Sequence, residues 1–285
     1  MINHVNKKKS FKLTDYDFLG SIYKNTIVSE LAETFESIKI QTHKPKKVVL
    51  VLDGYIQKKV LDLVDKYSSI LPIKKILLKN NVGLGIALKK GLLECESKIV
   101  LRFDTDDINL ARRAELIVAE LEKGDVDIVG TNIYEFEHNP QIRLSRKKMP
   151  LTHQSISRAI IIRNPINHPS VGFLRNSILK INGGYRHFPF YEDYDLWIRA
   201  LFSGLKFRNI DEELVALRIT DQRARRRGIK LVNSELRLLL TFLKHSFLHG
   251  LFFIPSCFFR IIFTLFPLKI ISICYKLFLR TEIKN

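Results

Sequence analysis

Short runs of aliphatic and β-branched residues alternate with longer segments of helical spacing through the first half of the chain. The short runs predict strands at residues 18–23, 48–52, 76–78, 99–103 and 127–130. Residues 48–52 are apolar at every position, which is typical of a parallel strand that is buried on both faces. The alternation therefore predicts a Rossmann-like α/β fold, in which a mixed, mainly parallel sheet is flanked by helices.

The longer segments place apolar residues three or four positions apart, which predicts amphipathic helices. These helices are expected at residues 27–41, from residue 84 onward, at 111–122 and at 192–203. Ser29 is the expected cap of the first helix. The last one begins with Glu192 and Asp193, which the helix dipole favours in a first turn. Residues 143–149 suggest a basic loop, and residues 182–185 suggest a glycine-rich turn.

Three carboxylates, those of Asp104, Asp106 and Asp107, follow the predicted strand at 99–103. Ligands of open α/β sheets bind outside the carboxyl ends of the strands, so this position favours a binding site. Three carboxylates within four positions repel one another unless donors or a cation compensate them. Mn²⁺ or Mg²⁺ takes such hard oxygen ligands, so we predict a metal site at these three carboxylates. The alternative is a solvated acidic turn that caps the helix expected at Ala111.

A second aspartate, Asp53, follows the predicted strand at 48–52 and precedes Gly54. Its carboxylate is a candidate acceptor for a nucleobase N–H. The simpler interpretation is a turn, in which Asp begins the bend and Gly supplies the positive φ. Asn81 and Gly83 precede the helix from residue 84, where they either line the same site or only cap that helix.

The second half of the chain offers Asp193 and Glu192 as candidate catalytic carboxylates. Attack by a hydroxyl of an acceptor molecule requires a base, and a carboxylate can accept the proton of that hydroxyl. His168 is the competing base, but a lone histidine is more often a structural residue, so we rank Asp193 first. The further candidates for contact with an acceptor are His168, Gly183, Gly184, Trp197, Arg226 and Arg227.

The chain is strongly basic, with 285 residues, a formal net charge of +18 and a pI near 9.8. Residues 220–285 carry twelve Lys and Arg residues against three acidic ones, and the same stretch is rich in Phe, Ile and Leu. This combination favours an anionic membrane surface over nucleic acid. Charged residues and prolines interrupt every apolar run in 232–280, so we expect interfacial helices and no spanning helix. The triplet 225–227 either anchors to lipid or binds a diphosphate.

The location expected for the protein follows from its cysteines and its first residues. Cys95, Cys257 and Cys274 are widely spaced, which supports neither a disulfide framework nor a zinc site and fits a reducing compartment. Residues 1–10 are polar and lysine-rich, and no apolar segment follows them as it would in a secretory signal. We therefore expect a peripheral protein on the cytoplasmic face of a membrane.

With these residues in place, the chain resembles the family 2 glycosyltransferases, within the bacterial branch that builds O-antigen, capsule and exopolysaccharides such as amylovoran. The resemblance runs over about residues 18–227, and weakly to residue 280. It is carried by linked motifs in order: Tyr23-Lys24-Asn25, Ser37 to Gln41-Thr42, Val51-Leu52-Asp53-Gly54, Asn81-Val82-Gly83-Leu84-Gly85, Asp104-Thr105-Asp106-Asp107, His168-Pro169-Ser170, Gly183-Gly184-Tyr185 and Glu192-Asp193-Tyr194-Asp195-Leu196-Trp197.

The resemblance implies a GT-A catalytic domain over residues 11–219. The composition of residues 220–285 independently predicts basic, amphipathic, membrane-associated helices after this domain. The resemblance further implies that Asp53 holds the uracil ring, and that Asp104 and Asp106 contact the ribose and the metal, with Asp106 as the leading metal ligand. Asp193 is the implied base. The implied reaction is inverting transfer of a hexose, glucose or galactose, from a UDP-sugar to a sugar on a polyprenyl diphosphate.

Two other classes of protein account for part of the sequence. A nucleic-acid-binding protein would explain the net charge, but the clustered carboxylates would repel phosphate in the absence of a metal. A nucleotidyltransferase shares the architecture and the metal-binding acids, but no glycine-rich phosphate loop follows the first strand.

Overall fold

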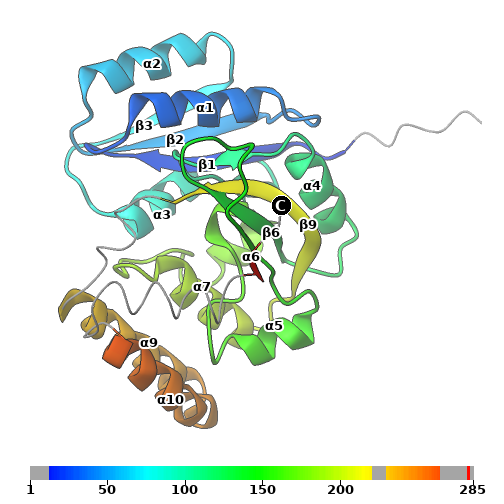
Figure 1. The fold of residues 1–285 in the computed structure, drawn as a ribbon, viewed down its shortest axis with the longest axis vertical. Coiled ribbons are helices and arrows are strands. Elements are labelled where there is room, and N and C mark those ends of the chain that lie inside the picture. The colour runs from blue at the N-terminus through cyan, green and yellow to red at the C-terminus, as the bar shows by residue number, and fades with distance from the viewer. Residues whose placement is uncertain (1–12, 220–228, 264–280, 283–285) are drawn as a thin grey trace, which may run out of the picture.

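The computed structural model describes residues 13–219, 229–263 and 281–282. A mixed β-sheet lies at the centre, with helices on both faces (Figure 1). The strands are β1 (Tyr16–Ile22), β2 (Lys47–Asp53), β3 (Ile73–Leu78), β4 (Ile99–Arg102), β5 (Ile108–Asn109), β6 (Ile128–Phe136), β7 (Ser145–Lys147), β8 (Gly172–Leu174), β9 (Phe207–Arg218) and β10 (Thr281–Glu282). The helices are α1 (Val28–Lys39), α2 (Lys58–Ser68), α3 (Leu84–Glu94), α4 (Arg113–Glu122), α5 (His153–Ala159), the 3₁₀ turn η1 (His168–Ser170), α6 (Arg175–Leu179), α7 (Glu192–Phe202), α9 (Ile229–His245) and α10 (Phe247–Phe263).

The strands in the first part of the sheet are parallel and bring their carboxyl ends to one edge. β1 lies between β2 and β4, β3 pairs with β2, and all three pairs are parallel. Beyond β4 the sheet is mixed, because β8 runs antiparallel to both β4 and β6 while β9 runs parallel to β6. The predicted α/β fold with a mixed sheet is confirmed. β8 and β9 were not predicted.

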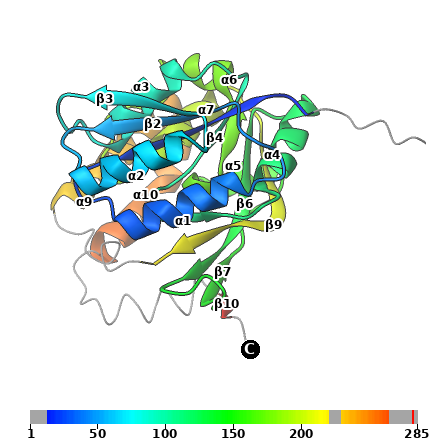
Figure 2. The ribbon, with the colours of Figure 1, turned by 90° about the horizontal axis from the view of Figure 1, so that it is seen from above.

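The central strands bury side chains on both faces, as the apolar run in β2 predicts. Val48 and Leu50 join the core under α1, α2 and α4, whereas Val49 and Val51 join the core that α3 and α7 cover. Figure 2 shows α1 and α2 side by side across one face of the sheet. Because both faces are covered, only the ends of the parallel strands remain open to a ligand.

The predicted cap of α1 is wrong, and so is the alternative in which the acidic turn caps α4. Helix α1 begins at Val28, its N-cap is Ile27 without a side-chain cap, and Ser29 lies inside the first turn. Helix α4 begins at Arg113, with Arg112 at the cap position and no capping side chain. Strand β5 separates α4 from the acidic turn, so the acidic residues do not cap this helix.

Of the two connecting segments predicted in the second half of the chain, one contains a strand and the other is the predicted turn. The predicted basic loop at 143–149 contains β7, because residues 145–147 pair with β6. The predicted turn at 182–185 is confirmed: Asn182, Gly183 and Gly184 all have positive φ.

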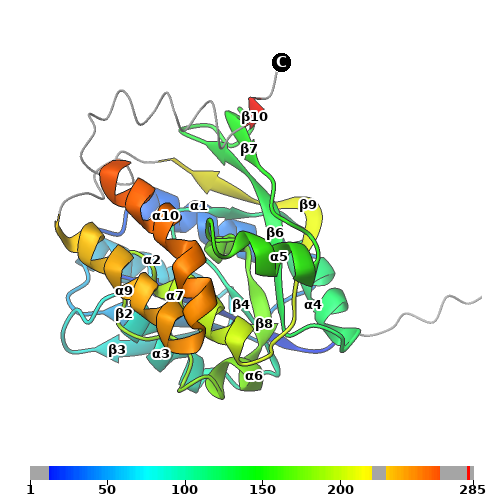
Figure 3. The same cartoon turned by 90° about the horizontal axis from the view of Figure 1, so that it is seen from below.

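The C-terminal helices α9 and α10 lie side by side, and α9 packs against α7 (Figure 3). No helix in the described part of the chain combines the length and apolar character needed to cross a membrane. Of the segment 232–280 predicted to form interfacial helices, residues 232–263 belong to this pair. Residues 264–280 lie outside the described ranges.

Candidate active site

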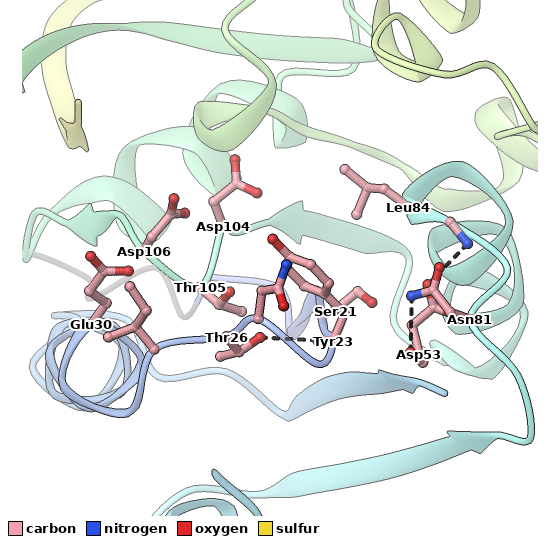
Figure 4. Close-up of a pocket in the computed structure, with 13 residues that line it drawn as sticks. Ser21, Tyr23, Thr26, Glu30, Asp53, Asn81, Leu84, Asp104, Thr105 and Asp106 are labelled. Atoms are coloured by element: carbon pink, nitrogen blue, oxygen red, sulfur yellow. Dashed lines mark hydrogen bonds between the residues drawn. The ribbon is translucent and has the colours of Figure 1, made fainter. Parts of the chain in front are cut away.

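A cavity of about 380 Å³ opens where β1, β2 and β4 end. Asp53 and Asn81 lie at one end of it, and Glu30, Asp104 and Asp106 lie at the other (Figure 4). Its lining consists of Ser21, Tyr23, Asn25, Thr26, Ile27, Glu30, Asp53, Asn81, Gly83, Leu84, Asp104, Thr105 and Asp106. The five residues predicted to bind a donor therefore share one pocket, although they come from three separate parts of the chain.

Asp53 is nearly buried at the carboxyl end of β2 and organises its end of the pocket. Its two carboxylate oxygens accept the backbone N–H groups of Val82, at 2.8 Å, and of Gly83, at 3.0 Å. Asn81 donates through its side-chain amide to the carbonyl oxygen of Asp53 at 3.1 Å. A carboxylate offers about four acceptor positions, so capacity remains for a ligand N–H at this end.

Gly54 allows these two segments to approach each other. Its φ is +80°, and a Cβ placed there would lie 2.6 Å from the backbone nitrogen of Asn81. A side chain would therefore be strained by the backbone angle and would also collide with the 80–83 loop.

The acidic end of the pocket has the composition of a divalent-metal site. Carboxylate oxygens of Asp104, Asp106 and Asp107 lie within 4.8 Å of one another. Oxygen ligands about 2.1 Å from one ion lie at most about 4.2 Å apart, so small side-chain rotations would suffice to share it. Three hard anionic donors fit Mn²⁺ or Mg²⁺ and do not fit a soft metal.

Two arginines, one at the end of β4 and one at the end of β9, hold the acidic turn in place. Arg218, at the end of β9, donates its backbone N–H to Asp107 Oδ1 at 2.8 Å and its Nε to the Asp106 carbonyl at 3.1 Å. Arg102, buried at the end of β4, pairs with Asp104. An arginine in an otherwise apolar strand was a signal in the sequence for a buried ion pair.

Glu30, which the sequence analysis did not select, lies in the same pocket. Burial and the neighbouring charge of Asp106 raise the pKa of the Glu30 carboxyl, and Arg218 at 3.7 Å opposes that rise. As a first-turn acid in α1, Glu30 looks like an ordinary partner of the helix dipole, so its sequence context does not mark it.

Asp193 is half-buried in the first turn of α7. Asn164 Nδ2 donates to its Oδ2 at 2.6 Å, and the Tyr194 backbone N–H donates to its Oδ1 at 2.8 Å. Burial raises the pKa of the Asp193 carboxyl, and these two hydrogen bonds and the charge of Arg102 partly offset the rise. Asn164 was not predicted from the sequence either, because a single asparagine in a loop has no distinguishing pattern.

Arg102 connects the acidic turn with the candidate base. It pairs with Asp104, and its positive charge also lowers the pKa of Asp193. Glu192 lies near the pocket from another direction, since a Cβ on Gly85 would lie 3.2 Å from the Glu192 Cβ. The structure thus brings Asp193 and Glu192 beside the donor pocket, while the cavity lining itself does not include them.

His168 and Trp197 lie in the core beneath the site. His168 Nε2 contacts the Tyr185 hydroxyl at 2.9 Å, and burial followed by the charge of Arg102 lowers the pKa of the imidazole well below its usual value. Trp197 is fully buried and meets the His168 ring edge-on. In this conformation Trp197 can influence an acceptor only through its neighbours.

The remaining acceptor candidates lie in two places. Gly184 is buried, and Gly183 lies against the Lys89 side chain, within the turn that precedes α7. Arg226 and Arg227 lie outside the described residues. The acceptor-binding role of these four residues stays a prediction.

The pocket at the strand ends and the helical cover on both faces of the mixed sheet define a GT-A fold. A similar fold is that of Staphylococcus aureus TarS residues 1–349 in complex with UDP-GlcNAc, with a TM-score of 0.63 and 18% identity. The match covers 80% of this chain and 66% of that chain.

Sequence comparison identifies the family. The family model described as Glycosyl transferase family 2 matches residues 22–182, which is more than half of the chain. A UDP-Gal:alpha-D-GlcNAc-diphosphoundecaprenol beta-1,3-galactosyltransferase from Escherichia coli is 35% identical over 93% of this chain and 96% of its own length. Amylovoran biosynthesis glycosyltransferase AmsE from Erwinia amylovora is 31% identical over 92% of this chain and 98% of its own. This chain belongs to glycosyltransferase family 2.

Proposed function

We propose that this chain transfers a hexose, galactose or glucose, from a UDP-sugar to a GlcNAc-type sugar on a lipid diphosphate, with inversion at the anomeric carbon. The observation that carries the proposal is the pocket at the strand ends, which gathers Asp53, Asp104 and Asp106 from separate parts of the chain into one cavity. The relative from Escherichia coli, whose name specifies UDP-Gal and a GlcNAc-diphospholipid, supports this choice of donor and acceptor.

In the proposed reaction Asp193 acts as the base. The acceptor hydroxyl gives its proton to a carboxylate oxygen of Asp193, and its oxygen forms a bond to the anomeric carbon. The bond from that carbon to the diphosphate breaks on the opposite side, and UDP leaves with the bonding electrons. Asn164 and the Tyr194 N–H hold the carboxylate in one orientation while the proton moves.

The donor would occupy the pocket lengthwise. Asp53 would accept the uracil N–H at one end, and Asp104, Asp106 and Asp107 would hold Mn²⁺ or Mg²⁺ at the other. A divalent cation bound there supplies charge neutralisation for the departing diphosphate. Glu192 would lie near the transferred sugar, because it adjoins the start of α3.

We also propose that the α9–α10 hairpin rests on an anionic membrane. On α10 the exposed apolar residues recur at helical spacing and form one broad face: Phe247, Leu248, Leu251, Phe252, Ile254, Phe258 and Phe259. Lys230 and Lys244 are exposed on α9, whereas the single acid of residues 229–263, Glu235, is buried. An apolar face and exposed lysines on the same hairpin fit anionic headgroups at the cytoplasmic face, where a lipid-linked acceptor would be presented.

The transfer assay that tests the proposal uses the full chain, Mn²⁺ and a GlcNAc-α-diphosphate carrying a short alkyl chain. Each of several UDP-sugars is offered, and product is detected by mass spectrometry. We expect one UDP-hexose to be consumed and Asp193→Asn to lower kcat by roughly 10²- to 10⁴-fold. Asp62→Asn, in the exposed face of α2, is the matched control and should leave kcat unchanged. Failure of the wild-type chain to transfer any UDP-hexose would contradict the proposal.

A further inference from the structure

The loop at residues 160–164 orients the carboxylate of Asp193. Asn164 donates to Asp193 Oδ2, and the side-chain oxygen of Asn164 accepts the Ile166 backbone N–H at 3.2 Å. These two bonds determine which way the asparagine amide faces. The orientation of the base therefore depends on where this loop lies.

The same loop is bound to the C-terminal hairpin. The carbonyl oxygen of Ile162 accepts from Ser256 Oγ at 2.7 Å and from Arg260 Nη1 at 3.2 Å, both on α10. The Ile162 side chain is 68% exposed, so it contributes little packing to hold the loop. The two bonds to its carbonyl link the loop to α10.

Arg260 also reaches the first turn of α7 by a second route. Its Nε donates to Glu235 Oε2 at 3.0 Å, and the buried Glu235 carboxylate accepts the hydroxyl of Tyr191. The guanidinium lies over the ring of Tyr194, 5.6 Å from its centre. Tyr191 and Tyr194 flank Glu192 and Asp193 in sequence, so both sides of the candidate base are connected to one arginine.

We propose that Arg260 is a positioning residue for Asp193. Through it, the α9–α10 hairpin contributes to the part of the site that takes the acceptor. The inference rests on the proposed function, because it takes Asp193 as the base. One guanidinium holds the loop that orients the carboxylate and the helix turn that carries it. A hairpin seated on lipid would thereby set the height of the base above the bilayer, where the diphosphate of the acceptor lies.

The first test separates positioning from folding by kinetics. Arg260→Ala should lower kcat for transfer about tenfold or more, since it removes two hydrogen bonds made by a charged group. The KM for the UDP-sugar and the Kd for UDP should not change, because the donor pocket is untouched. Arg260→Lys should recover part of kcat, since an ammonium can face Glu235 but cannot also match the fork geometry at Ile162. Arg208→Ala, which removes a surface arginine paired with Glu120 and Asp125, is the control.

A double-mutant cycle tests whether the effect passes through the loop. If Arg260 acts through Asn164, then Arg260→Ala should cost several-fold less in an Asn164→Ala background than in the wild type. Ser256→Ala is a milder variant that can be measured if Arg260→Ala folds poorly. It removes one hydrogen bond to the Ile162 carbonyl and leaves Glu235 paired with Arg260. It should lower kcat to a smaller extent. Full additivity of Arg260→Ala and Asn164→Ala would overturn the proposed route through the loop.

Hydrogen exchange gives a readout that does not need activity. In Arg260→Ala, amides of residues 160–166 and 191–195 should exchange faster, and those of residues 80–88 at the donor pocket should not change. Unchanged exchange at 160–166 together with an unchanged kcat would overturn the positioning role. Faster exchange there, in a protein that transfers no UDP-hexose, would support the connection between hairpin and turn while contradicting the proposed function.

Discussion

Replacing Asp53 with alanine removes two hydrogen bonds that join the end of β2 to the start of α3. The carboxylate is only 3% exposed and accepts the N–H groups of Val82 and Gly83 at 2.8 and 3.0 Å. Each bond to a charged acceptor is worth about 1.5–3 kcal/mol, so the upper bound for the pair is about 3–6 kcal/mol. Val82 and Gly83 are themselves partly exposed, and water replaces part of the loss. We therefore expect the free energy of unfolding to fall by about 2–3 kcal/mol, and by about half of that in Asp53→Asn, which keeps one acceptor oxygen.

Urea unfolding gives the stability of each variant, and calorimetric titration with UDP gives its affinity. The order wild type, Asp53→Asn, Asp53→Ala should hold for both quantities. If the carboxylate also accepts the uracil N–H, the affinity of the folded variants should fall about tenfold or more. Asp62→Asn serves again as the surface control. Unfolding of Asp53→Ala at the wild-type urea concentration would refute the structural reasoning, and unchanged UDP affinity in a folded variant would refute the nucleobase role.

Three further outcomes follow from the site and the hairpin. Burial raises the pKa of Asp193, and the base must be ionised, so kcat should begin to fall on acidification at a higher pH than an exposed aspartate would give. Asn164→Ala should move this fall to a still higher pH, because the hydrogen bond from Asn164 lowers the pKa of Asp193. EDTA should abolish transfer, and added Mn²⁺ should restore it. Asp106→Asn should require more Mn²⁺ to reach half of its maximal rate. A wild-type rate that does not depend on metal would contradict the metal site. Vesicles containing anionic lipid should sediment the wild-type chain, and the double change Phe258→Ser and Phe259→Ser should weaken binding about tenfold or more; equal binding of both proteins would exclude this face.

The core strands and the strand-end aspartates could be predicted from the sequence because their signals are local. The apolar run before Asp53 and the cluster from Asp104 to Asp107 depend on composition and position alone. Helix caps were harder to predict: Ser29 lies inside the first turn of α1, and no side chain caps α4. In both helices packing against the sheet compensates for the missing cap, and such long-range stabilisation leaves no local pattern.

By itself, the sequence determined the α/β class, the family and the two acidic positions at the edge of the sheet. Only the tertiary structure decided which residues, distant in the sequence, contact the catalytic and acidic residues of the site. Glu30 and Arg218 meet the acidic turn across more than 70 residues of chain, and Asn164 reaches Asp193 from a separate loop. Only the structure showed that Arg260 joins the hairpin to that loop. The physical reason is that each of these contacts depends on a single polar side chain placed by packing elsewhere, whereas strands and motifs are repeated patterns that neighbouring residues encode together.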